Sequence, residues 1–392
     1  MKAAQNRIAI IRTLATPIDQ KHYNSQELGL GRALLEHSIN VDVYVAGNTS
    51  RMSATTIAEN SGAKLRLLES PFRKLPLIQQ AWMPSVARHL KSERYDLIHV
   101  NESNELESWR IAGLAKRLSI PLMLYQGMYE PISGRVQTCF RAVFDKFCLP
   151  TLIQNTTIAM GKTRRAADFL KSKGFSEPIV LPVGLDTAPL ASSSSIDWRA
   201  NLAIPDDKLM VLYVGILEER RRPDLILELA TLNPQFAFAI AGTGPQLEML
   251  EKEKRNRQLD NLHLLGQVPQ ESLPDLYRTG NITLLPSDYE IYGMAVLESM
   301  YFGTPVIASR TAGPESIIDD QTNGWLIDGP ETANWQAALT HALTCPTTLN
   351  SISEAAARKI GTKLTWQSIA CQYAELVLNN AHSNKSNAGV SH

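Results

Sequence analysis

Two glutamates, Glu290 and Glu298, lie eight positions apart in the stretch LLPSDYEIYGMAVLESMYFGTPVI, residues 284–307. Apolar spacing predicts a helix over residues 294–302, which places Glu290 in the polar loop before that helix and Glu298 about one turn into it. The unpaired N–H groups at a helix start attract phosphate. A carboxylate one turn further in can accept hydrogen bonds from the hydroxyls of a ribose. The spacing therefore favours a sugar nucleotide with a diphosphate as the ligand.

The frame around the two glutamates is more specific than the glutamates themselves, which at this spacing are ordinarily solvated. It consists of Pro286-Ser287, Gly293, Gly303-x-Pro305-Val306-Ile307, Gly313-x-Glu315 and Asn323-Gly324. Over about forty residues this frame resembles glycosyltransferase family 4, the retaining nucleotide-sugar enzymes with a Glu-(x)7-Glu signature. The resemblance implies an α/β chain of GT-B fold, with two Rossmann-like, doubly wound domains that face a central cleft.

The elements that must position these residues alternate between strand and helix along the chain. A length of 392 residues, 44% of them hydrophobic and 20% charged, is typical of two globular domains. Strands alternating with helices predict parallel sheets covered on both faces. The expected divisions are an acceptor-side domain at 1–187, a nucleotide-sugar domain at 188–365, a helix at 366–380 that crosses back, and a disordered tail at 381–392.

Some local expectations concern the N-terminal half. Ser25 is placed to cap a helix that ends near His37, and two glycines inside that helix, Gly29 and Gly31, suggest close approach by a ligand or backbone or packing against the other domain. Helices are also expected at Ser53–Asn60 and Leu77–Leu90. In doubly wound sheets, ligands bind beyond the carboxyl ends of the strands. The loops after Ile11, Val100 and Tyr125 are therefore the ones expected to carry function.

Composition excludes several other classes. A formal net charge of zero gives no support for a nucleic-acid partner, and the four cysteines show neither a CxxC pair nor metal-ligand spacing. The absence of a signal peptide and of a spanning apolar run predicts a cytoplasmic protein. The stretch Phe72 to Arg94 combines an apolar stripe with basic residues. It is interpreted as a domain helix, with weak peripheral contact at the inner face of the membrane as the alternative.

The resemblance assigns the donor side of the site. Arg221, in the segment Gly215–Pro223, takes the place of the family's diphosphate-binding lysine, while Ile216 stands where the family has an arginine. Glu290 is expected near the donor sugar and Glu298 at the ribose. We expect Arg221 and Glu290 to be the catalytic residues. The remaining expected donor-binding residues are Gly215, Arg220, Gly242, Gly244, Gln267, Val268, Tyr292, Gly293 and Met294.

The acceptor side is expected in the N-terminal half. The polar loop before the first helix resembles the acceptor-side loop of family 4 enzymes from bacterial surface-polysaccharide clusters. Many relatives have His-Gly where this chain has Gln126-Gly127; the glutamine cannot act as a base, but its amide can bond a hydroxyl. The expected acceptor-side residues are Tyr23, Asn24, Gln26, Glu102, Gln126 and Gly127.

The function that the resemblance implies is retaining transfer of a hexosyl-type group from a nucleoside diphosphate sugar to an acceptor hydroxyl. The acceptor is expected to be a saccharide or lipid-linked saccharide in cell-surface polysaccharide or lipopolysaccharide biosynthesis. No metal and no cofactor are expected to be required, because Arg221 and the amides near Gly293 would stabilise the departing diphosphate. The alternative is a non-catalytic sugar-nucleotide or glycan-binding protein, which the departures at Ile216 and Gln126 motivate.

Overall fold

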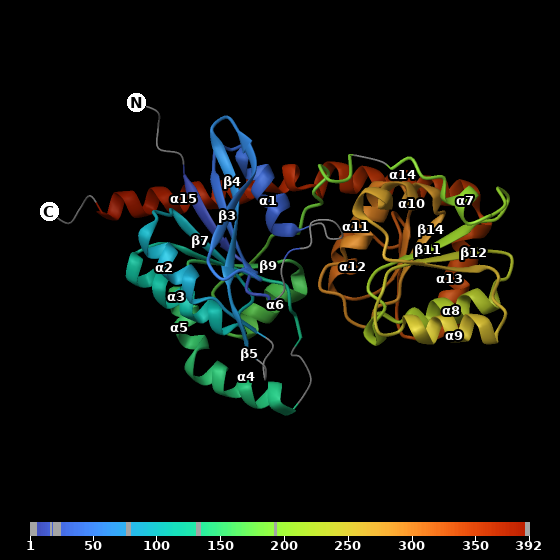
Figure 1. The fold of residues 1–392 in the computed structure, drawn as a ribbon, viewed down its shortest axis with the longest axis horizontal. Coiled ribbons are helices and arrows are strands. Elements are labelled where there is room, and N and C mark those ends of the chain that lie inside the picture. The colour runs from blue at the N-terminus through green and yellow to red at the C-terminus, as the bar shows by residue number, and fades with distance from the viewer. Residues whose placement is uncertain are drawn as a thin grey trace. The chain divides into compact units, whose positions relative to one another are not determined.

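A computed structural model of the chain describes residues 6–15, 18, 25–75, 80–130, 135–191 and 194–388 (Figure 1). The chain divides into two compact units. The N-terminal unit contains Ser25–Gly184, the described residues before it, and the helix that begins at Trp366. The C-terminal unit contains Leu185–Thr365. The C-terminal helix therefore belongs to the N-terminal unit.

The N-terminal unit is built on one mostly parallel sheet, with strand order β10-β9-β8-β7-β1-β2-β4-β3. Its strands are β1 (Arg7–Ile11), β2 (Asn40–Gly47), β3 (Ser53–Asn60), β4 (Ala63–Pro71), β7 (Leu97–Asn101), β8 (Leu122–Gln126), β9 (Ile158–Gly161) and β10 (Ile179–Val180), and a separate hairpin pairs β5 (Arg73–Leu75) with β6 (Gln80–Trp82). Its helices are α1 (Gln26–Leu35), α2 (Pro84–Ser92), α3 (Leu106–Leu118), α4 (Arg135–Phe147), α5 (Leu149–Asn155), α6 (Arg164–Ser172) and α15 (Trp366–Ala388).

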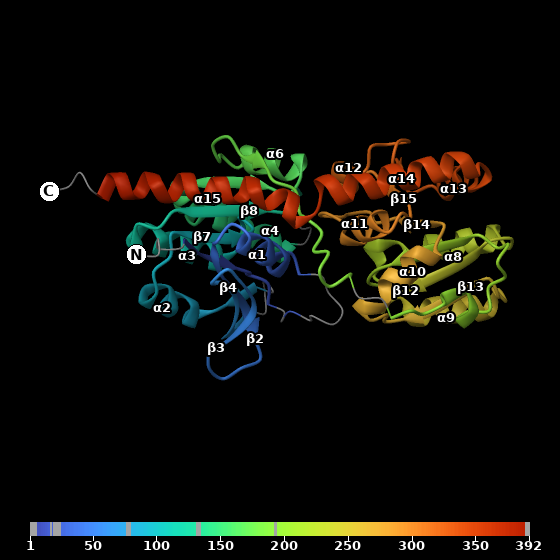
Figure 2. The same cartoon turned by 90° about the horizontal axis from the view of Figure 1, so that it is seen from above.

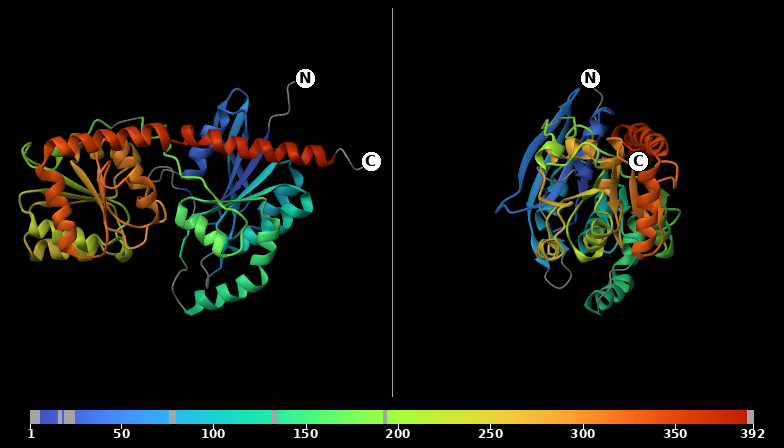
Figure 3. Two further views of the ribbon diagram at one scale, coloured as in Figure 1. Left: turned by 180° about the vertical axis from the view of Figure 1, so that it is seen from behind. Right: turned by 90° about the vertical axis from the view of Figure 1, so that its right-hand side faces the viewer.

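Apolar strand residues hold the helices on both faces of this sheet. β1, β7 and β8 are buried along almost their whole length, as expected for strands of a parallel sheet. One hydrophobic core joins the sheet to α2, α3 and α5. α1 packs against β2 and β4 and also against α15, which Figures 2 and 3 show as a long helix running along this unit. Nδ1 of His99 on β7 and the hydroxyl of Tyr373 on α15 form a hydrogen bond of 2.7 Å, which links that helix to the sheet.

The C-terminal unit repeats the same plan on a sheet of strand order β13-β12-β11-β14-β15-β16, parallel throughout. Its strands are β11 (Met210–Val214), β12 (Ala237–Ala241), β13 (Leu262–Gly266), β14 (Ile282–Leu285), β15 (Val306–Ser309) and β16 (Trp325–Ile327). Its helices are α7 (Trp198–Asn201), α8 (Pro223–Leu232), α9 (Leu247–Asn256), α10 (Leu273–Thr279), α11 (Met294–Tyr301), α12 (Ala312–Ile317), α13 (Thr332–Thr344) and α14 (Pro346–Lys363), with short 3₁₀ turns η1 (Glu219–Arg221) and η2 (Gln270–Ser272).

Each sheet reverses its strand order once. In the C-terminal unit the reversal lies between β11 and β14, and in the N-terminal unit between β1 and β7. Loops that leave neighbouring strands at such a point diverge to opposite faces of the sheet and leave a crevice, which is where ligands of doubly wound folds bind. The expected fold class, an α/β chain with two doubly wound sheets, is confirmed.

One expected helix, Ser53–Asn60, is wrong. The segment is strand β3, which pairs with β4 in an antiparallel hairpin closed between Asn60 and Ala63. The two turn residues, Ser61 and Gly62, have φ of 51° and 85°, as a tight hairpin turn demands. Most β3 side chains are exposed because β3 is the edge strand. It therefore shows no apolar alternation that could have revealed it as a strand.

Two further expectations need correction. The predicted helix Leu77–Leu90 begins only at Pro84, which occupies its first turn; residues 80–82 form β6, and residues 76–79 lie outside the described part of the chain. At the other end, α15 continues to Ala388, beyond residue 380 where the sequence analysis ended it. Residues 381–388 are mostly polar, but polar residues alone do not end a helix. Neither proline nor glycine occurs in this segment before Gly389, so the helix continues.

Candidate functional site

The candidate donor site lies at the strand reversal of the C-terminal unit. Arg221 comes from η1, which follows β11, and Glu290 comes from the loop that follows β14. Nη1 of Arg221 donates a hydrogen bond to Oε2 of Glu290 at 2.5 Å. Both side chains are largely buried, with 18% and 8% of their surface exposed. The structure thus brings together the two residues that the sequence analysis named as catalytic.

The guanidinium of Arg221 keeps most of its hydrogen-bonding capacity. Within the described part of the chain its one hydrogen bond is to Glu290, whereas a guanidinium has five N–H donors. Its Nε lies 3.5 Å from Oε1 of Glu218 and is buried without a hydrogen bond. Glu218, which sequence reasoning missed, also pairs with Arg220 at 2.6 Å. A buried, incompletely satisfied guanidinium is suited to binding phosphate oxygens.

Backbone contacts fix the loop that carries Glu290. Arg220 donates from Nη1 to the carbonyl oxygen of Tyr289 at 2.9 Å, and its own carbonyl oxygen accepts from the N–H of Asp288 at 2.8 Å. The N–H of Gly313 donates to the carbonyl oxygen of Glu290 at 3.2 Å. Arg220 is therefore already engaged in holding the loop, and Ile216, in the place of the family's arginine, is 55% exposed.

Helix α11 begins directly after this loop. Its N-cap is Gly293, with φ 91° and no side-chain cap, so no side chain of the cap satisfies the first N–H groups. Tyr292 is 2% exposed, and its backbone lies so close to Gly313 that a Cβ there would meet the Tyr292 carbonyl oxygen at 2.1 Å. Met294 is half-buried. Tight backbone packing thus orients the start of α11, where the sequence analysis expected phosphate.

Glu298 lies in the second turn of α11 and is buried, with 6% of its surface exposed. The hydroxyl of Tyr277 donates to its Oε2 at 3.1 Å, and Nε2 of Gln270 lies 3.5 Å from its Oε1. Burial raises the pKa of Glu298 to about 7, although the two hydrogen bonds act in the opposite direction. Tyr277 and Gln270, on α10 and η2, were missed because only the folded chain places them beside Glu298.

Two glycines allow close backbone packing at the remaining part of this edge of the sheet. A Cβ on Gly242 would lie 1.8 Å from the carbonyl oxygen of Gly215, and one on Gly244 would lie 2.4 Å from that of Leu217. The loops after β11 and β12 therefore pack backbone against backbone. Gln267 and Val268 follow β13 at the same edge, the first exposed and the second buried. Their expected contacts with a nucleotide stay predictions.

Three of the expected acceptor-side residues, Glu102, Gln126 and Gly127, lie at or just after the ends of β7 and β8, next to the strand reversal of the N-terminal unit. Glu102, in a left-handed conformation with φ 59°, accepts hydrogen bonds from the N–H groups of Gly127 and Met128 at 2.9 and 3.2 Å. Gln126 is fully buried; its Oε1 accepts from the N–H of Ser103 and its Nε2 donates to the Met128 carbonyl oxygen. These contacts join the loops after β7 and β8. The expected hydroxyl contact of Gln126 stays a prediction.

The remaining acceptor-side expectations have mixed outcomes. Gln26 is the first residue of α1, and Ser25 caps that helix by accepting from the N–H of Leu28, as expected. Tyr23 and Asn24 lie outside the described residues. Within the helix, a Cβ on Gly31 would lie 2.5 Å from the Leu65 side chain, so this glycine serves packing against β4 of its own unit.

The described part of the chain shows two further negative findings. It has no group of three or more His, Cys, Asp and Glu side chains arranged to hold a metal ion. It also has no helix long and apolar enough to cross a membrane. In the basic stretch 72–94, Val86 and Leu90 are fully buried in the core, so that part of the apolar stripe faces the sheet. Peripheral membrane contact by this stretch stays a prediction.

Comparison with known proteins finds similarity to glycosyltransferases. Residues 194–359 match the family model described as glycosyl transferases group 1. The D-inositol 3-phosphate glycosyltransferase of Geodermatophilus obscurus is 24% identical over 407 residues, which span 93% of this chain and 87% of that protein.

Solved structures show the same fold. Sucrose-phosphate synthase from Thermosynechococcus elongatus superposes with a TM-score of 0.75 at 20% identity, covering 96% of this chain and 99% of that one. Anabaena HepE, in complex with UDP and glucose, superposes with a TM-score of 0.71 at 15% identity, covering 95% and 100%. The expected glycosyltransferase resemblance and the GT-B fold are confirmed, while the Glu-(x)7-Glu signature of family 4 stays a prediction.

Proposed function

We propose that this chain, a glycosyltransferase of the GT-B fold, uses a nucleoside diphosphate sugar as its donor. Its C-terminal unit is the part that matches the glycosyl transferases of group 1. The enzyme moves a hexosyl-type group to an acceptor hydroxyl with retention of configuration. The observation that carries the proposal is the Arg221–Glu290 pair at the β11–β14 reversal, beside the start of α11. The HepE complex with UDP and glucose, on a related fold, supports a donor of this class.

In the proposed reaction the bond between the sugar's anomeric carbon and the diphosphate oxygen breaks. The acceptor oxygen bonds to the same face of that carbon, and its proton passes to the departing phosphate. Negative charge develops on the diphosphate, so the chief requirement is stabilisation of that charge. Arg221 and the N–H groups at the start of α11 supply it, Glu290 contacts the sugar hydroxyls, and Glu298 accepts hydrogen bonds from the ribose.

The acceptor that we propose is a saccharide or lipid-linked saccharide of a cell-surface polysaccharide or lipopolysaccharide. The relative from Geodermatophilus obscurus is named for an inositol phosphate instead. The acceptors tested should therefore include cyclic polyol phosphates. The proposed location is the cytoplasm, with the enzyme free or at the inner face of the membrane.

Incubation with radiolabelled nucleotide sugars, first without an acceptor, tests the donor class. We expect slow hydrolysis of one donor. If a nucleotide sugar binds but is not turned over, either alone or with any acceptor tried, the non-catalytic sugar-nucleotide-binding alternative is favoured instead.

Replacement of Arg221 tests its role. We expect Arg221→Ala to lower the turnover number on the order of a hundredfold, the usual effect of removing one charge-stabilising donor. Arg255→Ala, which removes an exposed arginine from α9 of the same unit, is the control and should leave turnover unchanged. An unaltered turnover number in Arg221→Ala would refute the assignment.

A further inference from the structure

A polar hollow lies in the N-terminal unit, and none of the residues assigned to the donor lines it. It has a volume of about 400 Å³ and lies between α2, the segment that follows β2 and the end of β4. We call it the α2 hollow. Its polar lining consists of three serines, two arginines and one histidine: Ser50, Arg51, Ser85, Arg88, His89 and Ser92. No carboxylate is among the residues that line it.

No carboxylate in the described part of the chain neutralises the two arginines of the α2 hollow. Arg51 and Arg88 are both exposed, and neither forms an ion pair within the described part of the chain. Nη2 of Arg88 donates to Oγ of Ser85, at 3.3 Å. Two other arginines of this unit behave differently, since Arg7 and Arg66 both pair with Asp42. The α2 hollow therefore combines hydroxyl donors with two guanidinium groups that have no ion-pair partner among the described residues.

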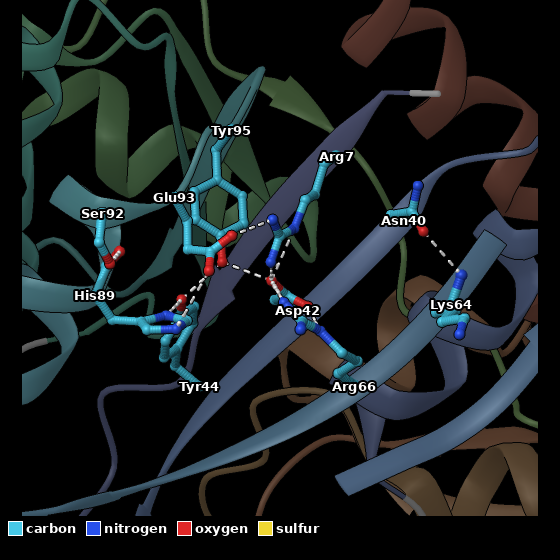
Figure 4. A network of polar contacts seen from close by, with 10 residues as sticks. All are labelled: Arg7, Asn40, Asp42, Tyr44, Lys64, Arg66, His89, Ser92, Glu93 and Tyr95. Carbon is cyan, nitrogen blue, oxygen red and sulfur yellow. Dashed lines mark hydrogen bonds and ion pairs between the residues drawn. The ribbon is translucent and has the colours of Figure 1, made fainter. Parts of the chain in front are cut away.

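A chain of hydrogen bonds leads from the sheet to His89 (Figure 4). Tyr95 contacts Asp42 at 2.5 Å, Tyr44 contacts Tyr95 at 2.7 Å, and Nδ1 of His89 contacts Tyr44 at 2.6 Å. Burial opposes ionisation of Asp42, but hydrogen bonds from Arg66 and Tyr95 and the charge of Arg7 lower its pKa below the usual range. Asp42 is thus a carboxylate, which can only accept.

The direction of every hydrogen bond in this chain follows from that carboxylate. The hydroxyl of Tyr95 donates its single proton to Asp42, so in the bond between the two tyrosines Tyr44 is the donor and Tyr95 the acceptor. Tyr44 then has no proton left and must accept from His89, so Nδ1 of His89 carries a proton. Nε2 is consequently the nitrogen of His89 available to a ligand. It lies 3.8 Å from Glu93, whose other oxygen pairs with Arg7 at 2.5 Å.

We propose that the α2 hollow binds a phosphate group carried by a small polyol or by a lipid headgroup. Arg51 and Arg88 supply planar forks for the phosphate oxygens, the serine hydroxyls supply further donors, and Nε2 of His89 donates when the imidazole is protonated. The volume admits a phosphate with a group about the size of a sugar ring. A polymer such as a nucleic acid is not favoured, because the chain has no net charge.

Calorimetry on the full-length protein with inorganic phosphate and glycerol 1-phosphate tests the proposal. We expect saturable binding to the wild type and at least about tenfold weaker binding to Arg51→Ala/Arg88→Ala, because two charged hydrogen-bond donors are lost. Lys91→Ala removes a positive charge from α2 outside the lining and should bind as the wild type does. Equal affinity of the double variant and the wild type, or no saturable binding, would overturn the proposal.

Two further variants make the result specific. Asparagine at position 89 keeps an N–H group near Nδ1 and lacks Nε2, so His89→Asn should bind phosphate several-fold more weakly and melt at the wild-type temperature. Arg221→Ala should bind phosphate as tightly as the wild type does, because Arg221 belongs to the proposed sugar-donor site and does not line the α2 hollow. If Arg221→Ala alone lost phosphate binding, the phosphate would be in the donor site and the proposal for the α2 hollow would be wrong.

Vesicle sedimentation identifies the source of the phosphate. Phosphatidylcholine vesicles with and without phosphatidic acid are compared for the wild type and the double variant. Binding that needs both phosphatidic acid and the two arginines assigns the α2 hollow to a lipid headgroup. Binding of glycerol 1-phosphate without vesicle binding assigns it to a soluble phosphate ester, and binding of neither overturns the proposal.

Discussion

We expect the buried carboxyl of Glu298 to make both the free energy of unfolding and the affinity for the proposed donor depend on pH near neutrality. Burial raises its pKa from the ordinary 4.5 to about 7. The difference of about 2.5 pH units corresponds to roughly 3 kcal/mol, at about 1.4 kcal/mol for each unit. Below pH 4.5 the carboxyl is protonated in both the folded and the unfolded chain, so the folded state carries no penalty. Between pH 4.5 and 7 the unfolded chain releases the proton while the folded chain keeps it.

Stability contributed by Glu298 is therefore lost as the pH rises through 7. We expect the free energy of unfolding of the wild type, measured relative to Glu298→Gln, to fall by roughly 3 kcal/mol between pH 4.5 and 8. Glutamine is the suitable comparison because it keeps the shape of the side chain and cannot ionise. Denaturant unfolding of both proteins at several pH values measures this difference. A difference that does not vary with pH would refute the reasoning.

Donor binding should respond in the opposite sense, since the ionised carboxylate is the better acceptor for ribose hydroxyls. We expect the affinity of the wild type for its nucleoside diphosphate to fall up to about tenfold for each pH unit below 7. Glu298→Gln should bind more weakly and lack this pH dependence. Parallel pH profiles for the two proteins would show that Glu298 does not contact the nucleotide.

Three further predictions concern Tyr277, His99 and two glycines. Removing the hydroxyl that donates to Glu298, in Tyr277→Phe, should raise the pH at which nucleotide affinity is half-maximal, as calorimetry across pH would show. Burial lowers the pKa of His99 to about 4, so wild-type stability relative to His99→Gln should decline by roughly 3 kcal/mol as the pH falls from 6.5 through 4; acid unfolding curves of equal shape would contradict this. Gly242→Ala would place a Cβ 1.8 Å from a carbonyl oxygen and should destabilise by at least about 2 kcal/mol, whereas Gly361→Ala, in open space within α14, should stabilise by up to about 1 kcal/mol in thermal unfolding.

Sequence patterns sufficed for the parts of the fold that are buried. Strands such as β1, β8 and β12 are short apolar runs, because a strand covered on both faces has few polar positions. The frame around Glu290 and Glu298 likewise combined a strand, a turn and a helix whose spacing limits where the glutamates lie. That is why these elements could be predicted without coordinates.

Exposed and long-range features could not be predicted in the same way. β3 is an exposed edge strand, so its pattern resembled a polar helix, and its identity depends on pairing with β4. Tyr277 lies 21 residues before Glu298, and no local spacing indicates that its hydroxyl meets that carboxylate. The donor directions that end at His89 depend on strands and a helix brought together only by folding.

Calorimetric titration of UDP, ADP, GDP and their sugar conjugates into the wild type and Arg221→Ala tests the central claim most directly. We expect one nucleotide series to bind the wild type and to bind Arg221→Ala at least about tenfold more weakly, because the variant loses charge-assisted bonds to the diphosphate. Equal affinity in both proteins would show that the β11–β14 reversal does not hold the diphosphate and would contradict the account.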